Sequence, residues 1–270
     1  METLRHVLWI GGPPGGGKSS VATRIARRYG LRWYGADTRT WQHRDRALRA
    51  GNAAACRWEA MTPEQRWVGS TPHEMLEGSL HRERGPMVID DLRALPGSPL
   101  VVAEGSTLPA WALSSGVAER SRAVWLLPTR QFQQATLADR DTAPGPTALY
   151  LLLGETIEQE ASEHRARTLL VDRSRGVEQM VAAVEELFAE ALAEGPRAET
   201  LAERRELLYE ANQAIADQVR DRYLRPWARG DAEAVMREFI CECGDPACDA
   251  SVLIPLGGLS SGAVLAPGHR

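Results

Sequence analysis

Residues 9–20, WIGGPPGGGKSS, decide the fold, and they contain Lys18, the one lysine of the chain. The sequence has 32 basic residues, and counting them gives 31 arginines and this lysine. One lysine among so many basic positions falls on a chosen position by chance about one time in thirty. The arginine bias itself fits genome composition or drift, but the neighbours of Lys18 argue further against a chance placement.

The neighbours of Lys18 form a phosphate-binding motif. GPPGGGKS fits the pattern G-x-x-x-x-G-K-[ST], with Gly12, Gly17, Lys18 and Ser19 at its fixed positions. The run HVLWI at residues 6–10 is typical of a buried parallel strand. After the motif, SSVATRIARRYG repeats apolar residues four apart and ends in a glycine, which indicates a helix. A strand, a glycine loop and a helix in this order are the context that the motif requires.

Each part of this loop has a chemical reason. Gly15, Gly16 and Gly17 lack a Cβ atom, so the loop can wrap around a phosphate and point its N–H groups inward. The helix that begins just after them adds its positive end. Ser19 offers a hydroxyl to Mg²⁺, and Ser20 follows it in the predicted phosphate-binding set.

The shape of lysine explains why it is kept at position 18. Its ammonium is a compact charge on a flexible stem, able to reach between the β and γ phosphates of a nucleotide. A planar guanidinium would be too wide for a loop that closes tightly on phosphates. The alternative, a glycine-rich turn without a ligand, is disfavoured by the predicted strand and helix on either side.

The rest of the first 193 residues predicts more strands alternating with helices. The clearest helix lies near residues 177–192, where apolar residues recur at helical spacing. This alternation predicts an α/β fold with a doubly wound parallel sheet. Residues 38–98 read as a mostly helical insert, where a kinase of this architecture would bind its acceptor. The further strand-like runs are LRWY (31–34), LVVAEG (100–105), AVWLLP (123–128) and RTLLVD (167–172).

Ligands of such sheets bind at the carboxyl ends of the strands, and Asp37 follows the second strand. An acid there faces the γ-phosphate side of the loop. It could take a proton from an acceptor hydroxyl or hold that hydroxyl in line. The alternative is that Asp37 caps the next helix, which is expected to begin near Thr38.

Glu104 ends the third predicted strand, beside the loop. An acidic residue at this place organises Mg²⁺ directly or through water, but aspartate is the commoner choice, and the alternative is that Glu104 contacts the acceptor. The competing segment MVIDD (87–91) also looks like an apolar strand that ends in acid. Pro86 as a first helical residue, together with the spacing of Val88 and Leu92, favours a helix for that segment.

Phosphoryl transfer needs cations over the transferring group, and in this chain arginines must supply them. Arg130 and Arg140 follow the fourth predicted strand, and Arg140 lies in ADRDTAPGP. The prolines and glycine of that stretch suggest a mobile loop, suited to a lid that closes over the nucleotide. The alternative for both arginines is a solvated position on a helix surface.

Residues 5 to about 193 resemble the P-loop kinases of the group that contains nucleoside monophosphate kinases, shikimate kinase and chloramphenicol phosphotransferase. The resemblance rests on GGPPGGGKSS, on Asp37 beyond the second strand and on the order of strands and helices. It implies ATP, Mg²⁺ and a small-molecule alcohol as acceptor. In the shikimate kinase and chloramphenicol phosphotransferase branches an aspartate at the position of Asp37 handles the acceptor hydroxyl. The third strand departs from the pattern by ending in a glutamate.

The tail is expected to form two further parts. Residues 194–230 read as a linker and a helix, in which Leu208, Ile215 and Val219 share one face and Pro226 follows the end. Residues 231–270 read as a small cysteine-containing module. Its segment CECGDPAC and a later PGH resemble a module found in bacterial proteins.

The cysteines of the module suggest a structural zinc site. Cys241, Cys243 and Cys248 could form a corner of a tetrahedral site, and His269 is the nearest candidate for the fourth ligand. Cys56 is a more distant candidate. Small buried cysteines and a redox site are the alternatives.

Composition limits the class of protein. The 270 residues are 43% hydrophobic and 25% charged, which is ordinary for a globular chain. A net charge of −4 predicts no general affinity for nucleic acid or anionic membranes. No run approaches the roughly 18 apolar residues that span a bilayer, and the first residues lack the apolar stretch of a signal peptide. We therefore expect a cytoplasmic protein, whose reducing surroundings favour metal over disulfides at the cysteine cluster.

The residues together predict a kinase that uses ATP and Mg²⁺ on a small-molecule acceptor. A nucleotide-binding regulator with a metal- or redox-sensing tail, and a toxin-like kinase of a nucleotide sugar, remain the alternatives. The sequence leaves the acceptor and the oligomeric state open. Within the insert, aromatic and basic side chains are expected either to contact the acceptor or to belong to the core: Trp41, His43, Arg46, Trp58, Trp67 and His73.

Overall fold

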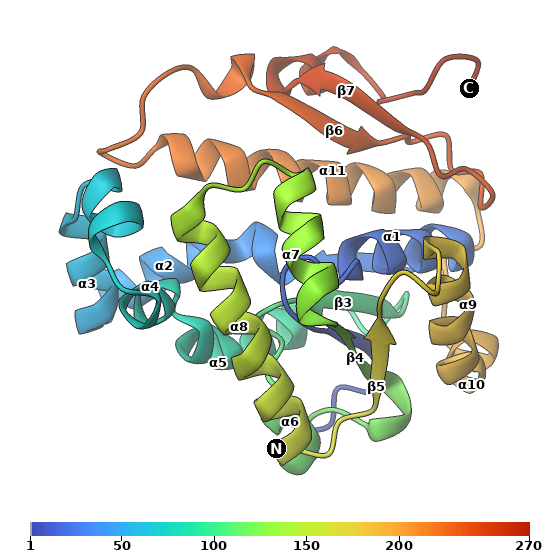
Figure 1. The fold of residues 1–270 in the computed structure, drawn as a ribbon. Helices are drawn as coiled ribbons and strands as arrows, with labels where there is room; N and C mark the ends of the chain where they lie inside the picture. The colour runs from blue at the N-terminus through green and yellow to red at the C-terminus, as the bar shows by residue number, and fades with distance from the viewer. Residues whose placement is uncertain (1) are drawn as a thin grey trace.

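A five-stranded parallel sheet forms the centre of the computed structural model, which describes residues 2–270 (Figure 1). The strand order β2-β3-β1-β4-β5 places β1 between β3 and β4, where the direction of the strand order reverses. Every strand begins and ends within one residue of its predicted position. The strands are β1 (Val7–Gly11), β2 (Arg32–Gly35), β3 (Val101–Gly105), β4 (Ala123–Pro128) and β5 (Thr168–Val171).

Helices cover both faces of the sheet, and alternate residues of β1 show why. Val7 and Trp9 face one side of the sheet, whereas Leu8 and Ile10 face the other, and all four are fully buried. The Leu8 side packs on α1 (Lys18–Tyr29), α9 (Val177–Leu187) and α10 (Ala189–Glu194). The Val7 side packs on α5 (His81–Ala94), α6 (Trp111–Ser114) and α8 (Pro144–Glu163). The predicted doubly wound α/β fold is confirmed.

The insert between β2 and β3 is helical, as predicted. It consists of α2 (Thr40–Arg49), α3 (Ala53–Ala60), a π-helical turn (Gln65–Gly69), α4 (Pro72–Ser79) and α5. MVIDD lies within α5, so the prediction of a helix there is confirmed. The prediction that Pro86 begins this helix is wrong, because Leu80, with φ of 59°, turns the chain so that α5 begins at His81.

The lid segment is more ordered than the sequence suggested. Only residues 140–143 separate α7 (Arg130–Asp139) from α8, because the prolines expected in a mobile loop form the first turn of α8, where a missing N–H is tolerated. Gly145 in that turn touches the insert, since a Cβ atom there would lie 2.0 Å from the Trp67 carbonyl oxygen. The start of α8 therefore packs directly on the insert.

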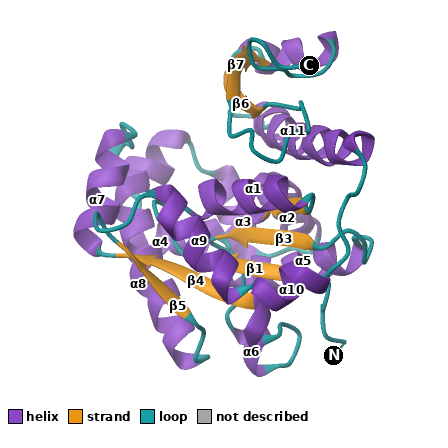
Figure 2. Ribbon diagram, turned by 90° about the vertical axis from the view of Figure 1, so that its right-hand side faces the viewer, coloured by secondary structure: helices purple, strands orange, loops and turns teal. Residues whose placement is uncertain are grey.

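The tail lies across the helix that follows the glycine loop (Figures 1 and 2). Its long helix α11 (Leu201–Tyr223) begins with a capping box, in which Thr200 and Glu203 bond each other's backbone N–H groups. The antiparallel hairpin of β6 (Met236–Ile240) and β7 (Ser251–Pro255) packs Phe239 against Val219 of α11. The small C-terminal annex is therefore present. Because α11 contacts both β2 and β6, the boundaries at residues 193 and 230 remain a prediction.

Within residues 2–270, no helix combines the length and the apolar character needed to cross a bilayer.

Candidate functional site

The glycine loop between β1 and α1 has the backbone conformation that the motif predicts. Gly12, Gly15 and Gly17 have φ of 135°, 85° and 73°, which residues with a Cβ atom rarely adopt. A Cβ atom on Gly12 would also lie 2.2 Å from the Leu126 carbonyl oxygen of β4. Gly17 precedes α1 and no side chain caps the helix, so the N–H groups of its first turn are free for an anion.

Lys18 is folded over its own loop. Its side chain is buried, and Nζ donates a hydrogen bond of 2.9 Å to the Pro13 carbonyl oxygen. Ser19 and Ser20 follow in the first turn of α1 and line a cavity with Glu104 and Asp37. The loop, the ammonium and the two hydroxyls are thus gathered at one place, as the sequence predicts for phosphate binding.

Glu104 stands beside the loop because β3 pairs with β1, which sets Glu104 opposite Ile10. The side chain is 2% exposed, and among the described residues its Oε2 has no hydrogen-bond partner. Burial raises the pKa of this carboxyl, Lys18 lowers it and Asp37 raises it, and together these effects bring the pKa to about 7. A buried carboxylate oxygen without a partner, next to the Ser19 hydroxyl, fits the all-oxygen ligands that Mg²⁺ prefers.

This environment predicts a pH-dependent cost to stability. Below the ordinary pKa of 4.5, Glu104 is protonated in both the folded and unfolded chain. Between 4.5 and about 7 only the unfolded chain ionises, so the free energy of unfolding falls, by up to about 3 kcal/mol. Glu104→Gln should abolish this fall, so the variant should unfold at a higher temperature than wild type at about pH 8 and at the same temperature at about pH 4.

Thermal unfolding without nucleotide or divalent metal tests this expectation. Glu77→Gln is the matched control, because Glu77 is exposed on α4 and should show no such gain. Equal unfolding temperatures for Glu104→Gln and wild type at both pH values would contradict the role of burial.

Asp37 lies in a 3₁₀ turn (Ala36–Arg39) that directly follows β2. The Ser106 hydroxyl, just past β3, donates a hydrogen bond of 3.2 Å to Asp37 Oδ1. The alternative that Asp37 caps the next helix is wrong, because α2 begins at Thr40 and no side chain caps it. The carboxylate instead lines two cavities, one on either side of it.

The first, which we call the inner cavity, has a volume of about 540 Å³ and lies between the glycine loop, the insert and α8. Three tryptophans and a tyrosine supply its apolar wall, and three arginines supply positive charge. Arg140, just after α7, is one of them, and its predicted role over the transferring phosphoryl group stays a prediction. The lining includes Pro14, Asp37, Trp41, Arg44, Trp58, Trp67, Arg84, Ser106, Thr107, Arg140, Tyr150 and Gln218.

Arg44 and Arg84 in this cavity are buried without an ionic partner among residues 2–270. Arg84 donates to the Ala36 carbonyl oxygen at 2.6 Å and to His43 Nδ1 at 3.3 Å. Arg44 donates to the Gly78 carbonyl oxygen, while its Nε and Nη1 have no partner in the described chain. Burial lowers the pKa of Arg44 to about 10, so the group stays charged at neutral pH. Two buried, unpaired guanidiniums indicate an anionic ligand.

These two arginines were missed by the sequence prediction. The available signal was the helical spacing of Arg84 with Val88 and Leu92, but Arg84 precedes Pro86, where the helix was predicted to begin.

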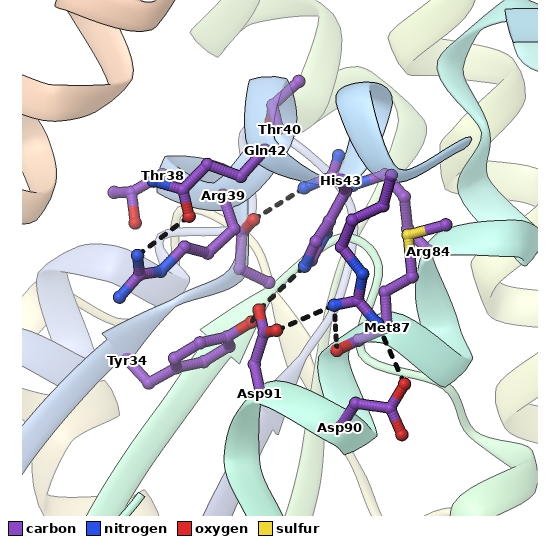
Figure 3. A network of polar contacts seen from close by, with 12 residues as sticks. Tyr34, Thr38, Arg39, Thr40, Gln42, His43, Arg84, Met87, Asp90 and Asp91 are labelled. Atoms are coloured by element: carbon purple, nitrogen blue, oxygen red, sulfur yellow. Dashed lines mark hydrogen bonds and ion pairs between the residues drawn. The ribbon is translucent and has the colours of Figure 1, made fainter. Parts of the chain in front are cut away.

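His43 and Arg46 do not line the inner cavity, although the sequence suggested them as acceptor contacts, and Figure 3 shows His43 directed at Asp91 instead. His43 Nε2 lies 2.8 Å from Asp91 Oδ2, and Arg46 donates to Asp91 Oδ1 at 2.9 Å. Because Arg84 donates to His43 Nδ1, the ring proton must be on Nε2, and burial lowers the pKa of His43. His43, hydrogen-bonded to Asp91, therefore holds the Arg84 guanidinium in position from outside the inner cavity. His73 is exposed and outside the lining.

The second cavity, which we call the outer cavity, has a volume of about 470 Å³ and lies between the glycine loop and the tail. Glu104, Ser19 and Asp37 line one side, and Gln218 of α11 borders both cavities. Arg130, predicted to bind the nucleotide, lies in neither lining and forms an exposed ion pair with Glu155 of α8. The hairpin supplies the opposite wall with Glu238, Phe239, Ile240, Cys248, Asp249, Ala250 and Ser251.

The predicted metal ligands of the tail come together. The Sγ atoms of Cys241, Cys243 and Cys248 and a ring nitrogen of His269 all lie within 4.8 Å of one another. Cys56 is exposed on α3 and is not part of this group.

Two solved structures have a likeness to this one. Shikimate kinase from Acinetobacter baumannii in complex with shikimate is 16% identical, with a TM-score of 0.41, over 68% of this chain and 93% of that chain. TT1252 from Thermus thermophilus is 20% identical, with a TM-score of 0.40, over 68% of this chain and 96% of that chain. These values are too low to support a function, and the fold rests on the strand order and loop geometry. No protein-family model matches the chain, and no curated protein does.

Proposed function

We propose that this chain is a P-loop kinase that transfers the γ-phosphate of ATP to a hydroxyl of a small anionic molecule. The observation that carries this proposal is the position of Asp37. Its carboxylate borders the outer cavity beside Ser19 and Glu104, and it also borders the inner cavity beside Arg84. An acid between a phosphate-binding loop and an enclosed acceptor cavity is the arrangement that transfer to a hydroxyl requires.

The loop side binds the donor. The free N–H groups at the start of α1 and the Lys18 ammonium bind the phosphates of ATP. Ser19 and Glu104 would hold Mg²⁺, which neutralises charge on the phosphates when it is bound. Binding of the phosphates and binding of Mg²⁺ require no side chain from the insert. ATP and the acceptor therefore bind to separate surfaces.

The inner cavity binds the acceptor. Arg44 has two guanidinium nitrogens without a partner in the described chain, and Arg84 lies in the same cavity without an ion pair to any described residue, so a carboxylate or phosphate of the acceptor would pair with them. Trp41, Trp58 and Tyr150 provide flat apolar surfaces for the remainder of the molecule. The acceptor class is therefore a small anionic alcohol with an apolar or ring-shaped body.

Asp37 accepts the proton of the reacting hydroxyl. The bond between the γ-phosphorus and the bridging oxygen of ATP breaks, and a bond forms from the acceptor oxygen to that phosphorus. The hydroxyl proton passes to the Asp37 carboxylate, which the Ser106 hydrogen bond holds in place. Arg140 lines the inner cavity from the lid side and stabilises negative charge on the transferring group.

Labelled ATP tests the reaction and identifies the acceptor class. Wild-type protein incubated with ATP labelled at the γ-phosphate and a pool of bacterial metabolites should produce a new labelled small molecule. Dividing the pool by anion exchange beforehand should place this acceptor in the anionic fraction. Label that stays on ATP in every fraction would contradict the kinase and favour a nucleotide-binding regulator. A product formed only from the neutral fraction would contradict the role of the buried arginines.

A further inference from the structure

The cysteine cluster of the tail has the dimensions of a zinc site. Cys241 Sγ and Cys248 Sγ lie 3.4 Å and 3.6 Å from His269 Nδ1. In a tetrahedral site with Zn–S of about 2.3 Å and Zn–N of about 2.0 Å, a sulfur and a nitrogen are about 3.5 Å apart. A disulfide between two of the cysteines would give no reason for an imidazole at this distance from both sulfurs.

The backbone around the cluster is shaped to present these ligands. Gly244, with φ of 78°, turns the chain after Cys243, and Gly268, with φ of 83°, turns it before His269. The Ala266 N–H donates to Cys241 Sγ at 3.3 Å, the kind of bond that orients a metal-bound thiolate. All three cysteines are buried and none forms a disulfide.

Apolar packing around the sulfurs of the hairpin is small. The buried groups around the sulfurs are the cysteines and Ala266, with no large apolar side chain among them. An isolated two-stranded hairpin is marginally stable, and so small a module needs a metal, a disulfide or a neighbour to order it.

Two arginines connect the cluster to the rest of the molecule. Arg27 of α1 is buried and donates to the carbonyl oxygens of Cys248 and, at 3.0 Å, of Cys241. Arg205 of α11 donates to the Cys243 carbonyl oxygen at 3.3 Å. The backbone of each cysteine is thus held by a guanidinium from a neighbouring helix. Three thiolates around one Zn²⁺ carry a net negative charge, which these two cations complement.

We propose that Cys241, Cys243, Cys248 and His269 bind one structural Zn²⁺ ion, and that this ion locks the hairpin onto α1 through Arg27. The ion orders the stretch that follows Cys248, and that stretch forms a wall of the outer cavity opposite Ser19 and Glu104. Zinc therefore determines whether the phosphate side of the site is closed, without contacting the phosphates.

Metal analysis of the purified full-length chain tests the site. We expect about one zinc per chain by mass spectrometry. Cys243→Ser should lose the zinc, whereas Cys56→Ser is the matched control and should keep it, because Cys56 is exposed and outside the cluster. Replacing zinc with Co²⁺ should give the visible absorption of a tetrahedral thiolate site in wild type and in Cys56→Ser only.

A second variant distinguishes loss of the zinc site from misfolding of the chain. His269→Ala alters an exposed residue near the chain end, and should weaken zinc binding by at least about 10-fold while the parallel sheet stays folded. Removing zinc from wild type should increase hydrogen exchange in β6, in β7 and around Arg27. A chain that takes up neither zinc nor cobalt, or cysteines found as a disulfide, would overturn the site. Unchanged exchange after zinc removal would overturn the lock on α1.

Discussion

Lys18→Ala is expected to reduce phosphoryl transfer by at least about 10³-fold, the scale of loss when a cation is removed from a transferring phosphoryl group. The buried ammonium is the only lysine charge in the chain, and no other lysine can replace it. Arginines of the inner cavity lie on the acceptor side of Asp37. The variant should also lose the thermal stabilisation that ATP·Mg²⁺ gives to wild type, because ligand binding to the folded state is what raises its stability.

Lys18→Arg separates charge from shape. Arginine keeps the positive charge, but the loop is closed around Lys18 and Gly12 already touches the Leu126 backbone. We therefore expect this variant to lose transfer by at least about 10²-fold. Activity close to wild type in Lys18→Arg would show that charge alone suffices and would contradict the explanation for the single lysine.

The single lysine also permits a direct measurement. Protein grown on lysine labelled with ¹⁵N at the side chain carries one labelled ammonium, so its NMR signal needs no assignment. That signal should shift on addition of ATP and Mg²⁺, because Lys18 Nζ exchanges the Pro13 carbonyl for phosphate oxygens. A signal that stays unchanged while ATP binds elsewhere would contradict the loop as the nucleotide site.

The sheet and the loop could be predicted because their signals are local. The strand, the motif and the helix after it occupy the 23 consecutive residues from Val7 to Tyr29, so one short pattern determines them. The ends of β1, β2 and β5 and the start of β3 differ from the prediction by one residue because pairing, rather than hydrophobicity, ends a strand. Gly35 joins β2 by pairing with Glu104 of β3.

The inner cavity could be predicted only in outline. The tryptophans of the insert do line it, but Trp41 and His43 look equally suitable in the sequence and have different roles. The role of His43 depends on Arg84, which is 41 residues from His43 and 48 from Ala36. No local pattern encodes such contacts, because they arise only when the insert folds back on the sheet.

In the tail, too, the local pattern could be predicted and the contacts between distant residues could not. Cysteine spacing predicted the ligand group, whereas its attachment to α1 through Arg27 spans 214 residues to Cys241. Arg27 reads in the sequence as one of many arginines on the surface of a helix. Its burial against the hairpin is visible only in the folded chain.

Asp37→Asn is expected to reduce transfer to the acceptor by about 10²- to 10⁴-fold, the usual contribution of a positioned general base. The amide has the size of the carboxylate, and its oxygen can still accept the Ser106 hydrogen bond, so the fold should be unchanged. Affinity for ATP should stay within about threefold of wild type, since the loop holds the phosphates without Asp37. The labelled-ATP assay and thermal stabilisation by ATP·Mg²⁺ measure the two effects separately.

Asp90→Asn is the matched control, because Asp90 lies on α5 in an exposed ion pair with Arg46 and lines neither cavity. It should transfer phosphate at the wild-type rate. If Asp37→Asn lost ATP binding together with transfer, Asp37 would belong to the phosphate and metal site rather than to the acceptor side. If it transferred at the wild-type rate, the carboxylate between the cavities would have no part in the chemistry, and the acceptor hydroxyl would have to be sought near Arg140. Retained ATP binding with lost transfer would place Asp37 in the transfer step rather than in nucleotide binding, as the proposed role on the acceptor hydroxyl requires.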